Sequence, residues 1–81
     1  MDIRVNFYSW FKDMIHCSET VVSLKPNSTI ADLKAGVFEQ FPKLSAVDKS
    51  MLVAVGVDYQ TADYILREGD EVSLFPPVQG G

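Results

Sequence analysis

The sequence has few of the residues that carry chemistry. Its 81 residues include one cysteine, one histidine and one tryptophan. A single cysteine excludes an internal disulfide, and the adjacent pair His16-Cys17 falls well short of the four ligands of a structural zinc site. The sequence also lacks a phosphate-binding glycine loop and a hydrolase nucleophile motif. We therefore expect no metal site, assign His16-Cys17 to a loop or strand edge, and look for any chemistry at the end of the chain.

Positive charge and long apolar runs are also scarce. Seven Lys and Arg residues against eleven Asp and Glu residues give a net charge of −4, which disfavours nucleic acid as a partner. No stretch approaches the roughly 20 apolar residues of a membrane span, and the N-terminus lacks the build of a signal peptide. We expect a single domain, soluble in the reducing cytoplasm, with no membrane partner.

The N-terminal third predicts two strands. Residues Ile3–Tyr8 alternate between apolar and polar side chains, as a half-buried strand does. Residues Glu19–Leu24 are rich in β-branched side chains and predict a second strand. Between them, Ser9–Ile15 loses the alternation and predicts a turn or a short helix. The two strands would form a wide hairpin.

The clearest predicted element is a helix that begins after Thr29. Thr29 and Asp32 have the spacing of a capping box, and Pro42 ends the pattern. Between these residues an apolar stripe runs at helical spacing, formed by Ile30, Leu33, Val37, Phe38 and Phe41. Gly36 costs about 1 kcal/mol relative to alanine in such a helix, which indicates either close packing on a sheet or simple tolerance.

The C-terminal half predicts two or three more strands. Lys43–Ser50 is polar and predicts a loop, whereas Met51–Val57 is a continuous apolar run that predicts a central strand covered on both faces. Asp58–Leu66 predicts a turn and a short strand. In the last predicted strand, Glu71–Phe75, the alternation directs two side chains inward, Val72 and Leu74, and three outward, Glu71, Ser73 and Phe75.

This order of elements predicts an α+β fold. A mixed sheet of four to five strands crossed by one main helix is the β-grasp, or ubiquitin-like, roll, and the single strong helix favours it over a ferredoxin-like fold. The predicted domain covers residues 1–75, and an extended tail covers residues 76–81.

The tail has an unusual composition for a chain end. Pro76 has no N–H for a strand ladder, and Pro76 with Pro77 favours an extended chain. Gly80 and Gly81 lack a Cβ and could pass through a channel too narrow for other residues. The reactive group at the tip is the α-carboxylate of Gly81, which is ionised at neutral pH and must be activated by a partner. The alternative is a frayed end without function.

The last sixteen residues resemble a known family. A turn with Gly69-Asp70-Glu71-Val72, the apolar pair Leu74-Phe75 and then Pro76-Pro77-Val78-Gln79-Gly80-Gly81 is similar to the C-terminus of the small subunits of molybdopterin synthase, which are ubiquitin-like sulfur carriers. The length and the opening strand fit as well. The chain departs from the family pattern at Gly56, near a position that is often asparagine.

The resemblance implies a mechanism centred on Gly81. A ubiquitin-activating-type adenylyltransferase would use ATP to adenylate Gly81, and a sulfur donor would convert the adenylate to a thiocarboxylate. The tail, with Pro76, Pro77, Val78 and Gly80, would enter the large catalytic subunit, where sulfur passes to cyclic pyranopterin monophosphate during molybdenum cofactor biosynthesis. The chain itself would then be no enzyme and would bind no cofactor. The alternatives are a sulfur carrier for thiazole synthesis, a protein modifier conjugated through Gly81, and a plain interaction domain.

A carrier also needs a docking surface. The candidates are three aromatic side chains: Tyr8 and Phe75 on the outward sides of their strands, and Tyr59 beside the predicted central strand. Acidic residues gather late in the chain, with Asp58, Asp63, Glu68, Asp70 and Glu71 against Arg67 alone. They either steer the domain to a basic pocket or form an ordinary solvated face.

Overall fold

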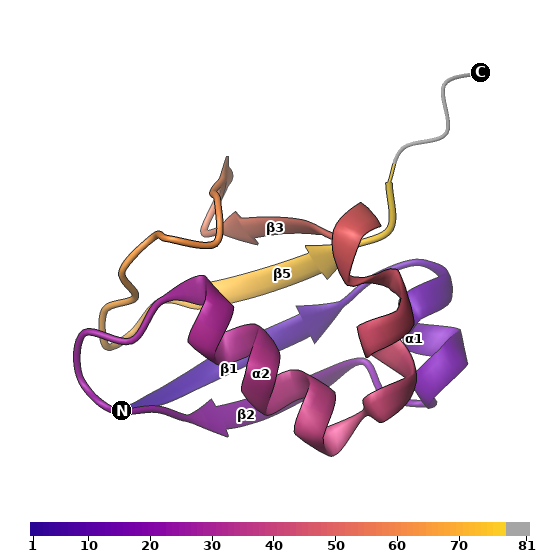
Figure 1. Cartoon of the computed structure of the whole chain (residues 1–81), viewed down its shortest axis with the longest axis horizontal. Helices are drawn as coiled ribbons and strands as arrows, with labels where there is room; N and C mark the ends of the chain where they lie inside the picture. The colour runs from indigo at the N-terminus through magenta and orange to yellow at the C-terminus, as the bar shows by residue number, and fades with distance from the viewer. Residues whose placement is uncertain (78–81) are drawn as a thin grey trace.

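The computed structural model describes residues 1–77, and these form a five-stranded mixed sheet crossed on one face by one long helix (Figure 1). The elements follow the order β1 (Asp2–Phe7), α1 (Trp10–Ile15), β2 (Glu19–Ser23), α2 (Ile30–Gln40), the 3-10 helix η1 (Pro42–Ser50), β3 (Leu52–Val55), β4 (Asp58–Tyr59) and β5 (Glu71–Phe75). The predicted β-grasp architecture is confirmed, and α1 is the short helix between the strands of the first hairpin.

The first and last strands of the chain lie side by side in the sheet. The strand order is β2-β1-β5-β3-β4, with β1 parallel to β5 and every other neighbouring pair antiparallel. In Figure 1 the arrows of β1 and β5 therefore point to the same end of the sheet. The residues that follow β1 and the residues that follow β5 meet at that end.

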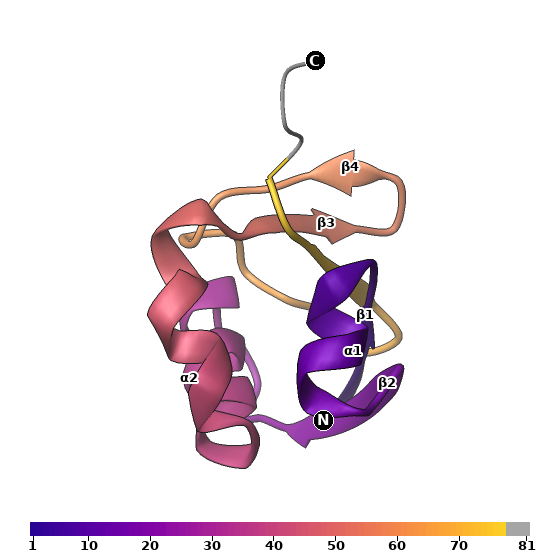
Figure 2. The same cartoon turned by 90° about the vertical axis from the view of Figure 1, so that its right-hand side faces the viewer.

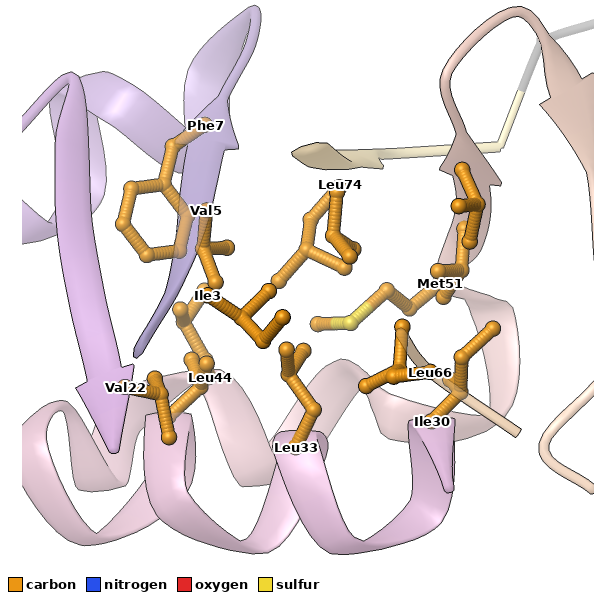
Figure 3. Packing of buried hydrophobic residues seen from close by; sticks show 14 of the residues in the cluster. Ile3, Val5, Phe7, Val22, Ile30, Leu33, Leu44, Met51, Leu66 and Leu74 are labelled. Carbon is orange, nitrogen blue, oxygen red and sulfur yellow. The ribbon is translucent and has the colours of Figure 1, made fainter. Parts of the chain in front are cut away.

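The core lies between α2 and the inner face of the sheet. In β1 the predicted alternation is confirmed, because Ile3, Val5 and Phe7 are at most 2% exposed. In α2 the predicted apolar stripe is buried fully at Ile30, Leu33 and Val37. Figure 3 shows side chains of α2 meeting those of the strands together with Leu44, Met51, Leu66 and Leu74. Burial of this stripe on the sheet orients α2 across it.

The beginning of α2 and its packing on β2 have clear causes. The Thr29 hydroxyl accepts a hydrogen bond from the Asp32 N–H at 3.3 Å, and the Asp32 carboxylate accepts one from the Thr29 N–H at 2.9 Å. This confirms the capping box. At Gly36 a Cβ would lie 2.7 Å from Cγ1 of Val22 in β2. Of the two explanations for Gly36, close packing on the sheet is therefore the correct one.

Two sequence predictions are wrong. The predicted loop Lys43–Ser50 belongs to η1, in which Pro42 occupies the first turn, the Ser45 hydroxyl donates to the Pro42 carbonyl at 2.8 Å, and Leu44 is fully buried. Leu44 is its one fully buried side chain and Val47 packs partly buried against the core, so the segment has the composition of a loop. The predicted central strand, β3, is the fourth of the five, and β5 is the middle strand. Side chains on both faces of β3 are buried, as predicted. Such burial shows that other side chains cover the strand, but it does not show which strands lie beside it.

The pair His16-Cys17 has a structural role. His16 ends α1 in the left-handed conformation with φ 55°, and the Cys17 thiol donates to the Glu19 backbone carbonyl at 2.9 Å. Within residues 1–77 no group of three or more His, Cys, Asp or Glu side chains is placed to hold a metal ion. None of the helices in that range is long and apolar enough to cross a membrane.

Candidate functional site

The candidate site begins where β5 ends. Phe75 is the last residue of β5, and Pro76 and Pro77 follow it outside any regular element, both partly buried. Pro76 cannot donate to the ladder, which accounts for the end of the strand at this position. The other predicted tail residues, Val78, Gly80 and Gly81, lie outside the described residues. The division into residues 1–75 and 76–81 and the chemistry of Gly81 therefore stay predictions.

The three aromatic residues predicted for docking form one group, here called the aromatic cluster: Tyr8, Tyr59 and Phe75. The rings of Tyr8 and Phe75 are stacked, with centroids 4.8 Å apart and planes at 12°. The rings of Tyr59 and Phe75 meet edge to face, with centroids 6.3 Å apart. Tyr8 is 44% and Tyr59 66% exposed, so the cluster is a surface feature with Phe75 at its centre.

Strand register brings the cluster together. Phe7 lies opposite Leu74 in the parallel pair, and the Tyr8 N–H donates to the Leu74 carbonyl at 3.3 Å. Tyr8 thus comes to lie beside Phe75. Because Phe7 and Leu74 point into the core, their successors Tyr8 and Phe75 point to the outer face. Exposed aromatic side chains gathered beside the start of the tail are typical of an interaction surface.

A polar group adjoins the aromatic cluster on the same face, and we call it the polar row: Asn6, Glu71 and Ser73. The Asn6 side-chain amide donates to Oε1 of Glu71 at 2.7 Å. Ser73 lies opposite Asn6 in the register and is 9% exposed. Its hydroxyl has no side-chain hydrogen bond in the described part of the chain. The sequence placed Glu71 and Ser73 outward but did not single them out, because Asn6 is their neighbour only once β1 pairs with β5.

The acidic residues lie mostly in solvent. Four of them, Asp58, Asp63, Glu68 and Glu71, are exposed, and the carboxylate of the fifth, Asp70, accepts the Arg67 N–H at 2.8 Å within a turn. The ion pairs found within residues 1–77 are Arg4–Glu19 and Lys34–Asp48, and they involve none of these five.

One exposed aromatic residue was missed by the sequence analysis. Trp10 begins α1, is 45% exposed, and meets the buried Phe11 edge to face with ring centroids 4.8 Å apart. It follows β1 at the end of the sheet where β5 also ends (Figure 2). The loss of alternation after Tyr8 hid its exposure, because a short helix has no strand-like faces from which exposure could be read.

The comparison with known protein families gives a match that includes the aromatic cluster and the tail. The model of the ThiS family matches residues 5–81, so the match covers the strands of the cluster and extends to Gly81. The chain belongs to the ThiS family. The resemblance found in the last sixteen residues is thereby confirmed for nearly the whole chain.

One curated relative and two solved structures are similar to this chain over nearly its whole length. The molybdopterin synthase sulfur carrier subunit of Escherichia coli (strain K12) is 31% identical over 81 residues, covering 98% of this chain and 99% of that protein. SAMP1 from Haloferax volcanii has a TM-score of 0.88 at 21% identity, with full coverage of both chains. A chain from the complex of subunits 1 and 2 of the molybdopterin-converting factor from Helicobacter pylori has a TM-score of 0.71 at 22% identity, with full coverage of both. At these identities the two structures support the fold.

The difference from the family pattern at Gly56 has a simple structural reading. Gly56 lies in the turn after β3 with φ +61°. Glycine and asparagine are the residues that adopt this conformation most readily. Gly56 therefore suits the left-handed conformation that this turn requires.

Proposed function

We propose that this chain is the sulfur-carrying small subunit of a molybdopterin synthase. The observation that carries the proposal is the family match through Gly81, together with the similarity over nearly the whole length to a carrier subunit of that name. The ThiS family name alone leaves the thiazole-synthesis carrier as an alternative. The Pro76-Pro77-Val78 spacer before the terminal glycines favours the molybdopterin carrier.

The chemistry proposed for Gly81 begins with a carboxylate that has a poor leaving group. A ubiquitin-activating-type adenylyltransferase joins the carboxylate to AMP with release of pyrophosphate from ATP. A sulfur donor then displaces AMP and leaves a thiocarboxylate, which is a good nucleophile at neutral pH. In the large catalytic subunit this sulfur forms a bond to carbon of cyclic pyranopterin monophosphate and displaces an oxygen leaving group. Water then cleaves the bond between the sulfur and the Gly81 carbonyl carbon, which leaves the sulfur on the pterin and returns Gly81 to its carboxylate. The small subunit supplies the carried atom, and the catalytic acids and bases belong to the partners.

The aromatic cluster is the proposed docking surface for these partners. Phe75 is both the centre of the cluster and the residue directly before Pro76. A partner that covers the cluster therefore holds the start of the tail at a fixed place relative to its own active site. Fixing one end of a short extended segment restricts where its other end can lie, which favours a productive position of Gly81.

The test of the proposal is the mass of the C-terminal peptide after purification from cells that contain the native activating enzyme. A thiocarboxylate adds about 16 Da, and because oxidation of methionine or Cys17 adds the same mass, the gain must be located on Gly81. Removal of Gly80 and Gly81 is the matched control and abolishes the gain. An unmodified tail in the presence of ATP, the activating enzyme and a sulfur donor would contradict the carrier proposal. Larger adducts joined through Gly81 would favour the protein-modifier alternative.

A further inference from the structure

Trp10 is an exposed aromatic residue outside the aromatic cluster. Large apolar side chains that lie singly in solvent are ordinary in folded proteins, and this chain has such residues in Val21, Val57 and Ile65. Trp10 differs from them in three respects. It lies beside the aromatic cluster, its ring is supported by a buried neighbour, and the residue before it has a strained backbone.

Trp10 follows the aromatic cluster along the chain and lies at the same end of the sheet. It is two residues from Tyr8, so the two Cα atoms are at most about 7 Å apart. The Tyr8 ring stacks on Phe75, which directly precedes Pro76. Figure 2 shows α1, which begins at Trp10, at the end of the sheet where β1 ends. A partner that covers the cluster and receives the tail therefore comes within reach of Trp10.

The indole of Trp10 has a fixed support. Its ring meets the ring of Phe11 edge to face, with the planes at 83°. Phe11 is fully buried and belongs to the core, so this support does not move with the surface. A rigid aromatic side chain loses little conformational freedom when a partner covers it. Tryptophan is accordingly enriched among the residues that contribute most to binding at protein interfaces.

Ser9 connects Tyr8 to Trp10 in a conformation that glycine normally adopts. Its φ is 58° and its ψ is −139°, close to the values of the first central residue of a type II′ turn, where glycine dominates. A residue with a Cβ is strained in this conformation. Helix capping does not explain the serine, because its side chain makes no cap hydrogen bond to α1. The backbone is held on one side by the ladder bond of Tyr8 to Leu74 and on the other by the burial of Phe11.

The strained serine and the exposed indole both lower the stability of the free chain. Glycine in place of Ser9 would relieve the strain, and a polar residue in place of Trp10 would remove apolar surface from water. Both positions are exposed, so neither change would remove a side chain from the core. Features that lower stability where a simple alternative exists are typical of functional sites.

We propose that Trp10 is a binding anchor for the protein that docks on the aromatic cluster, and that Ser9 is a positioning residue that fixes the indole beside Tyr8. The partner offers an apolar hollow for the indole and an acceptor for its Nε1–H, since a buried indole N–H is normally hydrogen-bonded. The identity of the partner rests on the proposed function, under which it is the large catalytic subunit. The activating enzyme and a second copy of this chain are the occupants that the experiment distinguishes from it.

The first experiment observes the indole directly, because Trp10 is the single tryptophan of the chain. The full chain is labelled with 5-fluorotryptophan, and its one 19F signal is followed by NMR while the large catalytic subunit is added. We expect the signal to shift and broaden, and the difference in its shift between H2O and D2O, which reports solvent exposure, to decrease. Binding detected by calorimetry without these changes would overturn the anchor and leave the proposed function standing. A loss of exposure with the activating enzyme alone, or with rising concentration of the chain alone, would also overturn the proposal.

The second experiment measures binding of variants to the large catalytic subunit by calorimetry. We expect Trp10→Ala to raise Kd roughly tenfold. The matched control Ile65→Ala removes a similarly exposed apolar side chain that lies beside Thr29 at the start of α2, and it should leave Kd unchanged. Equal Kd values for the two variants would overturn the anchor. If the wild-type chain does not bind the large subunit, the proposed function and this inference both fail.

The role of Ser9 has a separate signature. Ser9→Gly relieves strain and should raise the urea midpoint, yet it should also raise Kd about threefold, because the indole is then less firmly oriented. Ser9→Ala keeps the Cβ and should leave both quantities unchanged. A residue with a purely structural role would not change stability and affinity in opposite directions. An unchanged Kd for Ser9→Gly would show that Ser9 does not position the indole.

Discussion

Replacement of Gly36 by alanine tests the packing of α2 on the sheet most directly. In an isolated helix this change stabilises by about 1 kcal/mol, because glycine has more backbone freedom to lose. Here the new Cβ would lie 2.7 Å from Cγ1 of Val22, about 0.8 Å closer than the optimal carbon–carbon contact of about 3.5 Å. Val22 is 4% exposed and β-branched, so it has little room to rotate away.

The two effects oppose each other, and packing is expected to win. Inserting a methyl group into a tight core costs about 1–3 kcal/mol. The net expectation for Gly36→Ala is therefore a loss of about 1 kcal/mol in the free energy of unfolding. Val22→Ala alone costs about 2 kcal/mol, because it removes two buried methyl groups and leaves a space beside Gly36.

The double variant Gly36→Ala with Val22→Ala separates the effect of helix propensity from the effect of packing against Val22. Once Val22 is alanine, the contact is gone, and Gly36→Ala should stabilise by about 1 kcal/mol, which gives a coupling energy of about 2 kcal/mol between the two positions. Urea unfolding followed by circular dichroism measures all four proteins, with an unchanged denaturant slope as the sign that the comparison is valid. A Gly36→Ala variant that is more stable than wild type would refute the reasoning. So would a double variant whose change in unfolding free energy equals the sum of the changes in the two single variants.

Three further predictions concern the helix start, the aromatic cluster and the tail. Thr29→Ala removes the capping box and should lower stability by about 1 kcal/mol in the same urea assay, with thiocarboxylation measured by mass unchanged. Phe75→Ala removes both ring contacts and should lower the free energy of unfolding by about 1–2 kcal/mol, measured by thermal unfolding. It should also weaken partner binding far more than Thr29→Ala does. If the two variants weaken binding equally, docking at the cluster is wrong. Deletion of Gly80 and Gly81 should leave the urea midpoint unchanged, because glycine has no side chain to bury, while abolishing the gain of about 16 Da.

Local patterns predicted most of the fold. The alternation in β1, the capping box at Thr29 and the apolar stripe of α2 are short-range signals, and the structure confirms each one. One failure came from position in the sheet, and the other was the missed helix η1. An apolar run such as Val53–Val55 reports that both faces are covered, but the sequence does not say which strands lie beside it. In η1, a single buried leucine among polar residues gave no periodic signal.

The candidate site was predictable in its parts but not in its assembly. Tyr8 and Phe75 were expected to face outward and Tyr59 to lie beside the predicted central strand, yet the contact of Tyr8 with Phe75 depends on pairing between residues more than sixty positions apart in the chain. The hydrogen bond from Asn6 to Glu71 depends on the same pairing. Once β1 and β5 are known to be parallel neighbours, period-two alternation places Tyr8, Phe75 and the polar row on one face.

The position of β5 in the sheet also bears on how a tail can be delivered to a partner. Chain ends usually fray, because a terminal strand or helix has few contacts to hold it. Here the last strand is the middle one and is hydrogen-bonded to β1 on one side and β3 on the other. Phe75 is therefore held by its two neighbouring strands and by the rings of Tyr8 and Tyr59 before any partner binds. A partner does not have to order the start of the tail, so more of the binding free energy remains for orienting the residues beyond it.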